Sequence, residues 1–164
     1  MDFFIQNGIE WIVWIQSLGA WLEALMKFFS FLGSEEFFLL AMPIFYWSIN
    51  TDLGIRMGLV LLVNTSVNHI FKVAMGGPRP YWVSQRVTPM AAETSFGVPS
   101  AHAQTAAGVW GICAAWLRKP WAWIVATVVV LLIGFSRMYL GMHFLHDVLL
   151  GWLLGGLSVW AFTA

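Results

Sequence analysis

The amino-acid sequence predicts an all-α integral membrane protein, a polytopic bundle of about six transmembrane helices. Of its 164 residues, 60% are hydrophobic and only 10% are charged, whereas an average soluble domain has about 25% charged residues. The apolar residues gather in long runs, and a helix needs roughly 20 of them to cross a hydrocarbon core of about 30 Å. We expect residues 1–164 to form a single membrane-embedded domain.

Five of the expected helices follow directly from the apolar runs. These runs cover residues 36–50, 53–74, 100–117, 120–140 and 143–164. Pro43 lies within the first run and is expected to kink its helix.

The N-terminal region is more polar and predicts a different arrangement. Charged residues interrupt it at Glu10, Glu23 and Lys27. We therefore expect residues 3–16 to lie in the membrane interface as an amphipathic helix and residues 18–33 to form the first membrane helix. The start of the chain has acidic residues and no basic one, which is not typical of a cleavable signal peptide.

One connection is much longer than the others. Residues 75–99 are rich in glycine and proline, which argues against a single regular element. Long irregular loops within compact domains are usually functional. By contrast, Gly151 and Gly155 form a small-residue step that predicts close packing between helices.

The charged residues fall into two groups that the alternation of helices places on opposite membrane faces. Arg56, Arg118 and Lys119 lie at one set of helix ends, and the other set has Lys72, Arg79, Arg86, Arg137 and Asp147. If the second group consists of working residues, the first group marks the cytoplasm by the positive-inside rule. The eight basic and eight acidic residues balance and indicate no nucleic-acid partner.

Three short motifs carry most of the second group. They read K-x6-R-P from Lys72, P-S-A-H over residues 99–102, and S-R-x5-H-x3-D from Ser136 to Asp147. Converging cations need an anion, and arginine matches phosphate oxygens with two parallel hydrogen bonds. Ser100 is a good N-cap for the helix that follows, and the free N–H groups at a helix start bind phosphate.

The histidines of these motifs predict a nucleophile and a general acid. His143 and Asp147 are spaced i, i+4 and therefore share one face of a helix. The carboxylate can hold one imidazole nitrogen and leave the other free to attack phosphorus. His102 then remains available as general acid.

Taken singly, each residue has an ordinary structural interpretation. Lys72 would be a snorkelling anchor at a helix end, and Arg79 and Glu93 would be solvated loop residues. His69 and His146 are expected to be packed polar residues, and the same would hold for either motif histidine alone. Three cations, two histidines and an aspartate on one face are hard to explain as separate anchors, so we favour a site.

The three motifs, in this order, resemble the signature of the type 2 phosphatidic acid phosphatase superfamily, which includes membrane lipid phosphatases and vanadium haloperoxidases. The resemblance covers residues 72–147, and the hydrophobic layout fits the six-helix membrane branch. In one place the sequence departs from the family pattern: P-S-G-H is usual, and Ala101 replaces the glycine. A backbone N–H remains at this position, so we expect activity to survive.

The resemblance implies a role for each motif residue. His143 would form a phosphohistidine, Asp147 would orient it, and His102 would protonate the leaving group and then activate water. Residues 75–99 would form the active-site loop. The phosphoryl oxygens would be bound by residues of all three motifs: Lys72, Arg79, Ser100, Ala101 and Arg137.

The same resemblance implies a membrane lipid phosphate or polyprenyl diphosphate as substrate, the lipid bilayer as surroundings, and no cofactor. A magnesium site needs carboxylates, and Asp147 is the only acidic residue of the motifs, so no metal is expected. We expect a bacterial inner-membrane protein whose site faces the periplasm or exterior. A lipid phosphotransferase with the same intermediate, and a non-enzymatic anion-binding or transport protein, remain as alternatives.

Overall fold

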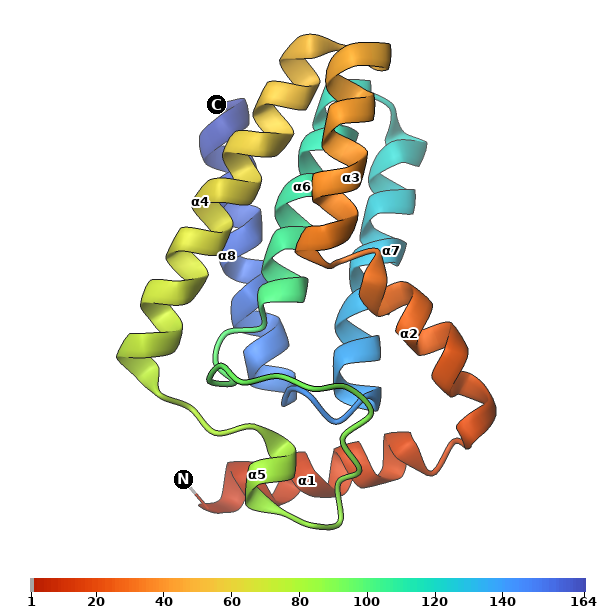
Figure 1. Ribbon diagram of the computed structural model, residues 1–164, viewed down its shortest axis with the longest axis vertical. Helices are drawn as coiled ribbons and strands as arrows, with labels where there is room; N and C mark the ends of the chain where they lie inside the picture. The colour runs from red at the N-terminus through yellow and green to blue at the C-terminus, as the bar shows by residue number, and fades with distance from the viewer. Residues whose placement is uncertain (1) are drawn as a thin grey trace.

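The computed structural model describes residues 2–164, with side chains described from residue 5 onward, and this part of the chain contains helices and no strand. Figure 1 shows a bundle of long helices with a helix lying across one end. The elements in chain order are α1 (Asp2–Gln16), η1 (Ala20–Leu22), α2 (Glu23–Phe31), α3 (Glu35–Ile44), η2 (Phe45–Ile49), α4 (Thr51–Met75), α5 (Pro80–Val83), α6 (Ala101–Leu117), α7 (Pro120–Tyr139) and α8 (Leu145–Thr163).

Three stretches are long and apolar enough to cross a membrane: Thr51–Val83, α7 and α8. The number rises to four if Ile5–Gln16 and Ala20–Phe31, which are bent by 85°, count as one broken span. The remaining long helices are shorter than a full crossing, because α3 has 10 residues and α6 has 17. The all-helical membrane architecture predicted from the sequence is confirmed, whereas the structure gives three to four candidate spans.

The predicted apolar runs become helices with modified ends. Residues 36–50 begin as α3 but continue from Phe45 as a π-helix, two residues after Pro43. Residues 18–33, expected to be one helix, start with a 3₁₀ turn before α2. The long loop contains a short helix, α5, which begins at Pro80 because proline is well suited to the first turn.

Helix α4 is bounded by a cap at each end, and these caps fix where its last turn lies. At its start, the backbone N–H of Leu53 donates to Oδ1 of Asn50 at 2.9 Å. At its end, Gly76 adopts φ 57°, a left-handed conformation that glycine adopts easily. Lys72 is thereby placed in the final turn, close to the start of the loop.

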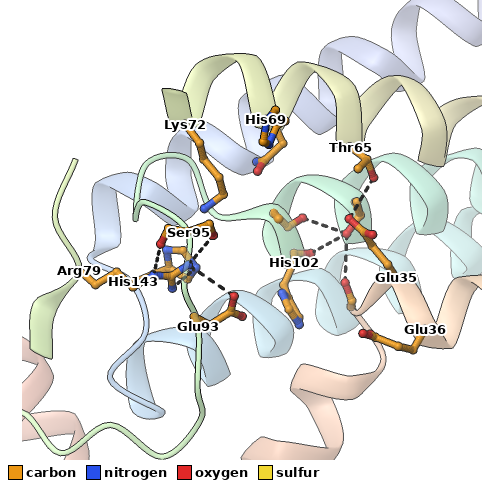
Figure 2. A pocket seen from close by; sticks show the side chains of 14 residues that line it. Glu35, Glu36, Thr65, His69, Lys72, Arg79, Glu93, Ser95, His102 and His143 are labelled. Atoms are coloured by element: carbon orange, nitrogen blue, oxygen red, sulfur yellow. Dashed lines mark hydrogen bonds and ion pairs between the residues drawn. The ribbon is translucent and has the colours of Figure 1, made fainter. Parts of the chain in front are cut away.

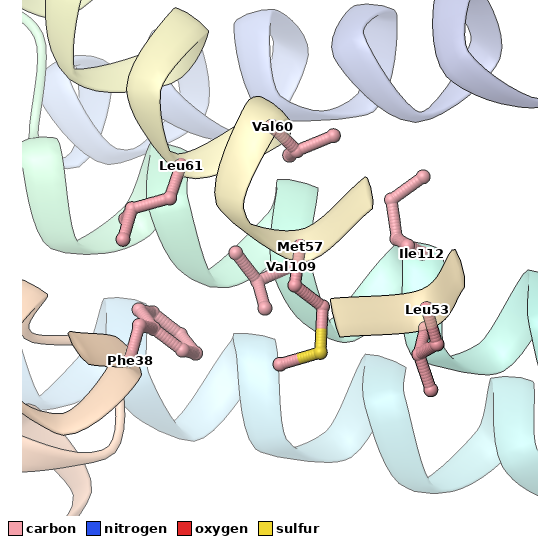
Figure 3. Packing of buried hydrophobic residues seen from close by; sticks show 7 residues of the cluster. All are labelled: Phe38, Leu53, Met57, Val60, Leu61, Val109 and Ile112. Atoms are coloured by element: carbon pink, nitrogen blue, oxygen red, sulfur yellow. The ribbon is translucent and has the colours of Figure 1, made fainter. Parts of the chain in front are cut away.

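Helix α6 lies at the centre of the bundle. Figure 3 shows a buried apolar cluster formed by side chains of α3, α4 and α6: Phe38, Leu53, Met57, Val60, Leu61, Val109 and Ile112. On its other side α6 packs closely against α8, where a Cβ at Gly155 would lie 2.4 Å from the carbonyl oxygen of Gln104. The close packing predicted for Gly151 and Gly155 is confirmed.

Helix α1 lies across the end of the bundle that holds the long loop (Figure 1). Ile12 and Ile15 are 1% and 4% exposed, while Trp11 and Trp14 are 64% and 57% exposed. The isoleucines of α1 thus face the bundle and its tryptophans face outward, while the location of this helix in the membrane interface stays a prediction. Gln16 ties it to the long loop, since its Nε2 donates to Thr88 O at 2.7 Å and its Oε1 accepts from Thr88 N at 3.1 Å.

Candidate active site

Four helix ends meet at the end of the bundle that α1 crosses: the last turns of α4 and α7 and the first turns of α6 and α8 (Figure 1). They surround a cavity of about 280 Å³, shown in Figure 2. Its lining comes from the long loop, from helices α3, α4 and α6, from the turn between α2 and α3, and from the connection between α7 and α8: Gly33, Glu35, Glu36, Thr65, Asn68, His69, Lys72, Arg79, Glu93, Ser95, Ala101, His102, Thr105 and His143.

The predicted nucleophile, His143, is held by the predicted carboxylate. Its Nδ1 lies 3.3 Å from Oδ2 of Asp147, which also accepts from the backbone N–H of Phe144 at 2.9 Å. Both side chains of the pair are buried. Burial, reinforced by the charge of Arg137, lowers the pKa of His143 to about 3. The imidazole is therefore neutral at physiological pH, with its Nε2 on the side of the cavity.

A second histidine lies on the other oxygen of this carboxylate. Nε2 of His146 is 3.1 Å from Oδ1 of Asp147, a buried oxygen that accepts no hydrogen bond in the described chain. The His146 side chain is half-exposed and stacks on Phe144, with ring centroids 5.3 Å apart. His146 therefore adds to the electrostatic surroundings of Asp147 and does not line the cavity.

Arg79 is only 1% exposed, although it follows a glycine-rich loop. Its guanidinium is held by backbone and side-chain oxygens: Nε donates to Ser95 O at 2.7 Å, and NH1 donates to Met142 O at 3.1 Å. NH1 also lies 3.4 Å from Nε2 of His143. A phosphate that meets the histidine thus also meets this arginine.

Arg137 lies behind the cavity and shares a carboxylate with Arg79. Its NH1 donates to Ser30 Oγ at 2.6 Å, and its NH2 lies 2.9 Å from Oε1 of Glu93. Oε2 of Glu93 is 3.5 Å from NH2 of Arg79. The expectation that Glu93 is a solvated loop residue is therefore wrong, because it bridges two buried cations across 14 and 44 positions of sequence.

Lys72 reaches over the loop from the last turn of α4. Its ammonium donates to the carbonyl oxygen of Phe96, and the residue is 6% exposed. It lines the cavity together with Arg79. The interpretation of Lys72 as a snorkelling anchor does not fit this buried position.

The P-S-A-H motif forms the start of α6. Ser100 is the N-cap, as predicted, and its Oγ accepts from Ala103 N at 3.4 Å. The first N–H groups of a helix have no partner within the helix, so those of Ala101 and His102 remain available at the cavity. Arg118 is the only non-glycine residue with positive φ in the described chain. Ala101 therefore needs no glycine-like backbone angle.

His102 follows in the first turn of α6, and its ring lines the cavity beside His143 and Glu35 in Figure 2. Among the side chains of residues 5–164 and the described backbone, its ring nitrogens have no hydrogen-bond partner, so both stay available for proton transfer. His69 on α4 lines the same cavity from the opposite side, although the sequence suggested only a packed polar residue.

The structure thus brings the predicted residues together in two shells. Lys72, Arg79, Ala101, His102 and His143 line the cavity, while Ser100, Arg137 and Asp147 are buried behind them. The spacing of the motifs did not indicate the polar partners from other elements, above all Glu93, Ser30 and Ser95. In the described chain no three His, Cys, Asp or Glu side chains are grouped to hold a metal ion.

Known proteins match the chain in sequence. The PAP2 superfamily profile covers residues 53–164. Phosphatidylglycerophosphatase B of Bacillus subtilis (strain 168) is 32% identical over 149 residues, which cover 82% of this chain and 70% of the relative. Glucose-6-phosphatase 3 of Homo sapiens is 30% identical over 188 residues, covering 99% of this chain and 54% of the relative. The chain thus spans about half the length of the glucose-6-phosphatase.

Solved structures share the fold. A transmembrane PAP2 type phosphatidylglycerolphosphate phosphatase from Bacillus subtilis superimposes with a TM-score of 0.83 at 31% identity, covering 96% of this chain and 84% of that one. LpxE of Aquifex aeolicus shares the fold with a TM-score of 0.83 at 22% identity, over 93% and 92% of the two chains. The resemblance and the phosphatase class predicted from the three motifs are confirmed, and this chain belongs to the PAP2 superfamily.

Proposed function

We propose that this protein is a metal-independent lipid phosphate phosphatase that works through a phosphohistidine at His143. The observation that carries the proposal is the position of this buried imidazole. Its Nδ1 lies 3.3 Å from the carboxylate of Asp147, and its Nε2 lies 3.4 Å from a guanidinium nitrogen of Arg79. An oriented, neutral nucleophile thus stands beside a phosphate-binding cation in one cavity.

The proposed reaction has two displacements at phosphorus. Nε2 of His143 attacks, the P–O bond to the lipid alcohol breaks, and His102 gives its proton to the leaving alkoxide. His102 then takes a proton from water, whose oxygen attacks the phosphohistidine, and the P–N bond breaks to release inorganic phosphate. Asp147 stabilises the positive charge that the imidazole ring gains while it carries the phosphoryl group.

Fixed positive charge accounts for the expected independence from metal ions. Lys72 and Arg79 line the cavity, and the first N–H groups of α6 point out of its N-terminus. Arg137 supports them from behind through the shared carboxylate of Glu93. Such preorganised donors stabilise the charge that develops on the phosphoryl oxygens in the transition state, which is the task a magnesium ion would otherwise have.

Residues 1–164 would form one domain of the bacterial inner membrane with about six membrane helices, of which three or four are long enough to cross by themselves; α1 would lie in the interface, and residues 75–99 would form the active-site loop. The cavity faces the periplasm. Arg56 and Arg118 line a separate cavity at the opposite end of the bundle, where the positive-inside rule places the cytoplasm. The lipid tail stays in the bilayer while its phosphate enters the site.

The orientation is tested by single cysteines at Gln85 and at Lys119 in a chain without Cys113. An impermeant thiol reagent added to intact cells is expected to label position 85 and to spare position 119. Labelling of position 119 alone would reverse the topology.

The activity is tested with purified protein in excess EDTA and a panel of lipid phosphates that includes phosphatidylglycerol phosphate, phosphatidic acid and a polyprenyl diphosphate. We expect release of inorganic phosphate without added metal. Activity that disappears and returns with Mg²⁺ would refute metal independence. Transfer of phosphate to an alcohol in place of water would favour a phosphotransferase, and binding without turnover an anion-binding protein.

Rapid quench with labelled substrate separates the two histidines. His143→Ala is expected to form no phosphoenzyme. His102→Ala is expected to lose about 10²–10⁴-fold on a lipid monophosphate and less on an aryl phosphate, whose leaving group needs little proton assistance. Phosphoenzyme in His143→Ala, or equal losses on both substrates in His102→Ala, would contradict the assigned roles.

A further inference from the structure

We infer that the part of the cavity beyond His102 is a subsite for the leaving alcohol, lined by hydrogen-bond acceptors, which selects lipid phosphate monoesters whose alcohol carries hydroxyl or ammonium donors near the phosphate. The inference rests on the proposed function, because it assigns the alcohol to the side of the cavity opposite the attacking histidine.

The cavity extends well past the phosphate-binding cations. Along α4 its lining runs from Lys72 back to Thr65, which is two helical turns or about 10 Å. The facing wall is the corner between α2 and α3, which is fixed against α6 because Thr105 Oγ1 donates to Gly33 O at 3.0 Å. In a displacement in line with His143 Nε2, the leaving oxygen points away from the nucleophile and into this extension.

The extension offers hydrogen-bond acceptors with free capacity. Asn68 is 3% exposed, and its Nδ2 already donates to Gln104 Oε1 at 2.9 Å and to Pro99 O at 3.3 Å. Among the described residues no donor reaches its Oδ1, although Asn68 lines the cavity. Oδ1 of Asn68 is not among the fully buried atoms that lack a partner, so it is accessible from the cavity, and a donor on the substrate can bind it.

Two carboxylates complete the subsite. Oε1 of Glu35 accepts from Thr65 Oγ1 at 3.1 Å, and Glu36 lines the cavity next to it. Among the side chains of residues 5–164, neither carboxylate has an ion-pair partner. Acidic residues at the start of α3 also complement its helix dipole, but this role would not require them to line the cavity that holds the reacting histidine.

The two ends of the cavity therefore have opposite requirements. The cationic end takes the phosphoryl dianion, and the acceptor end takes donors and repels a second anion. An alcohol with hydroxyl or ammonium groups on its first carbons meets both requirements, because Asn68 lies one turn from Lys72 along α4. Glu35 and Glu36 are exposed, so a plain alkyl chain would displace water from them without offering a donor, and a diphosphate would bring negative charge toward them.

The test compares lipid phosphates with the same chain at equal mole fraction in mixed micelles: octadecyl phosphate, 2,3-dihydroxyoctadecyl phosphate and 2-amino-3-hydroxyoctadecyl phosphate. We expect kcat/KM of the wild-type protein to be about tenfold or more higher for each donor-bearing substrate than for octadecyl phosphate. In the double variant Glu35→Gln/Glu36→Gln, kcat/KM for the donor-bearing substrates is expected to lie within about threefold of that for octadecyl phosphate. The largest loss of kcat/KM is expected for the aminated substrate.

Glu23→Gln serves as the matched control, since Glu23 lies on α2 in an exposed pair with Lys27 outside the cavity. It should keep the wild-type ratio. Equal kcat/KM for the three substrates in the wild-type protein would overturn the inference. So would a double variant that keeps the wild-type ratio of kcat/KM between donor-bearing and plain substrates. Either result would leave the phosphatase function intact. Failure to hydrolyse any of the three lipids would instead count against the proposed function itself.

Discussion

Removing the charge of Glu93 is expected to make the empty site bind inorganic phosphate more tightly. The carboxylate lies 2.9 Å from NH2 of Arg137 and 3.5 Å from NH2 of Arg79. In Glu93→Gln the side chain keeps its length and one carbonyl oxygen but loses its charge. The two cations then lack the anion that competes with phosphate for them.

The structure indicates that this change leaves Arg79 in place. The guanidinium keeps its bonds to Ser95 O at 2.7 Å and to Met142 O at 3.1 Å, and Arg137 keeps Ser30 Oγ at 2.6 Å. A charge-assisted hydrogen bond exceeds a neutral one by about 1–2 kcal/mol. The inhibition constant of phosphate should therefore fall by about 5- to 30-fold.

The measurement is competitive inhibition of lipid phosphate hydrolysis by inorganic phosphate, supported by thermal unfolding with and without phosphate. Glu93→Asp keeps the charge, and Glu10→Gln removes an exposed charge that pairs with Arg86 at the surface; both should give an inhibition constant near that of the wild type. Weaker inhibition in Glu93→Gln would refute the reasoning and show that the carboxylate mainly orients the arginines.

Three further outcomes follow from the packing and the charges. Burial lowers the pKa of His143 from 6.5 to about 3, so between these pH values the unfolded chain binds more protons than the folded one and acid destabilises the fold. In His143→Gln the midpoint temperature of thermal unfolding should therefore fall less steeply as the pH is lowered from about 6.5 to 4. A pH dependence equal to that of the wild type would argue against a neutral buried imidazole. Gly155→Ala should lower the free energy of unfolding by about 1–3 kcal/mol, because its Cβ would lie 2.4 Å from Gln104 O. At Gly156 a Cβ would meet nothing within 4 Å, so Gly156→Ala should be neutral or mildly stabilising in thermal unfolding. Gln16→Ala should speed hydrogen exchange at the Thr88 amide, which donates to Gln16 Oε1 at 3.1 Å, and unchanged exchange would show that α1 does not hold the loop.

The sequence was most informative where a contact lies within one turn of helix. Ser100 was predicted as an N-cap from its place before an apolar run, and the structure shows this cap. The i, i+4 spacing of His143 and Asp147 predicted a shared face, and their side chains meet at 3.3 Å. Such contacts depend on helical geometry alone, so they follow from spacing without knowledge of the tertiary fold.

Contacts between residues of different elements could not be predicted from the spacing of residues in the sequence. Glu93 lies in an irregular loop, and nothing in its neighbours indicates that Arg79 and Arg137 both turn toward it. Likewise, Glu35 begins a helix that seemed remote from the motifs, yet the α2–α3 corner folds back beside Thr105 and brings it to the cavity. The N-terminal helices are bent by 85° at a break that contains Gly19, whose φ is 112°, and the interrupted hydrophobic pattern does not give the size of this bend.

The contact between α6 and α8 joins the second and third motifs in space. The backbone N–H of Ser100, the N-cap of α6, donates to the carbonyl oxygen of Asp147 at 3.0 Å. One turn further along α8, a Cβ at Gly151 would lie 2.7 Å from the carbonyl oxygen of Ser100. The residues that would cradle the phosphate and the pair that would attack it are therefore joined backbone to backbone. A side chain at position 151 would push the two helices apart and lengthen the path from His143 to phosphorus, so the glycine belongs functionally with the motifs although it carries no reactive group.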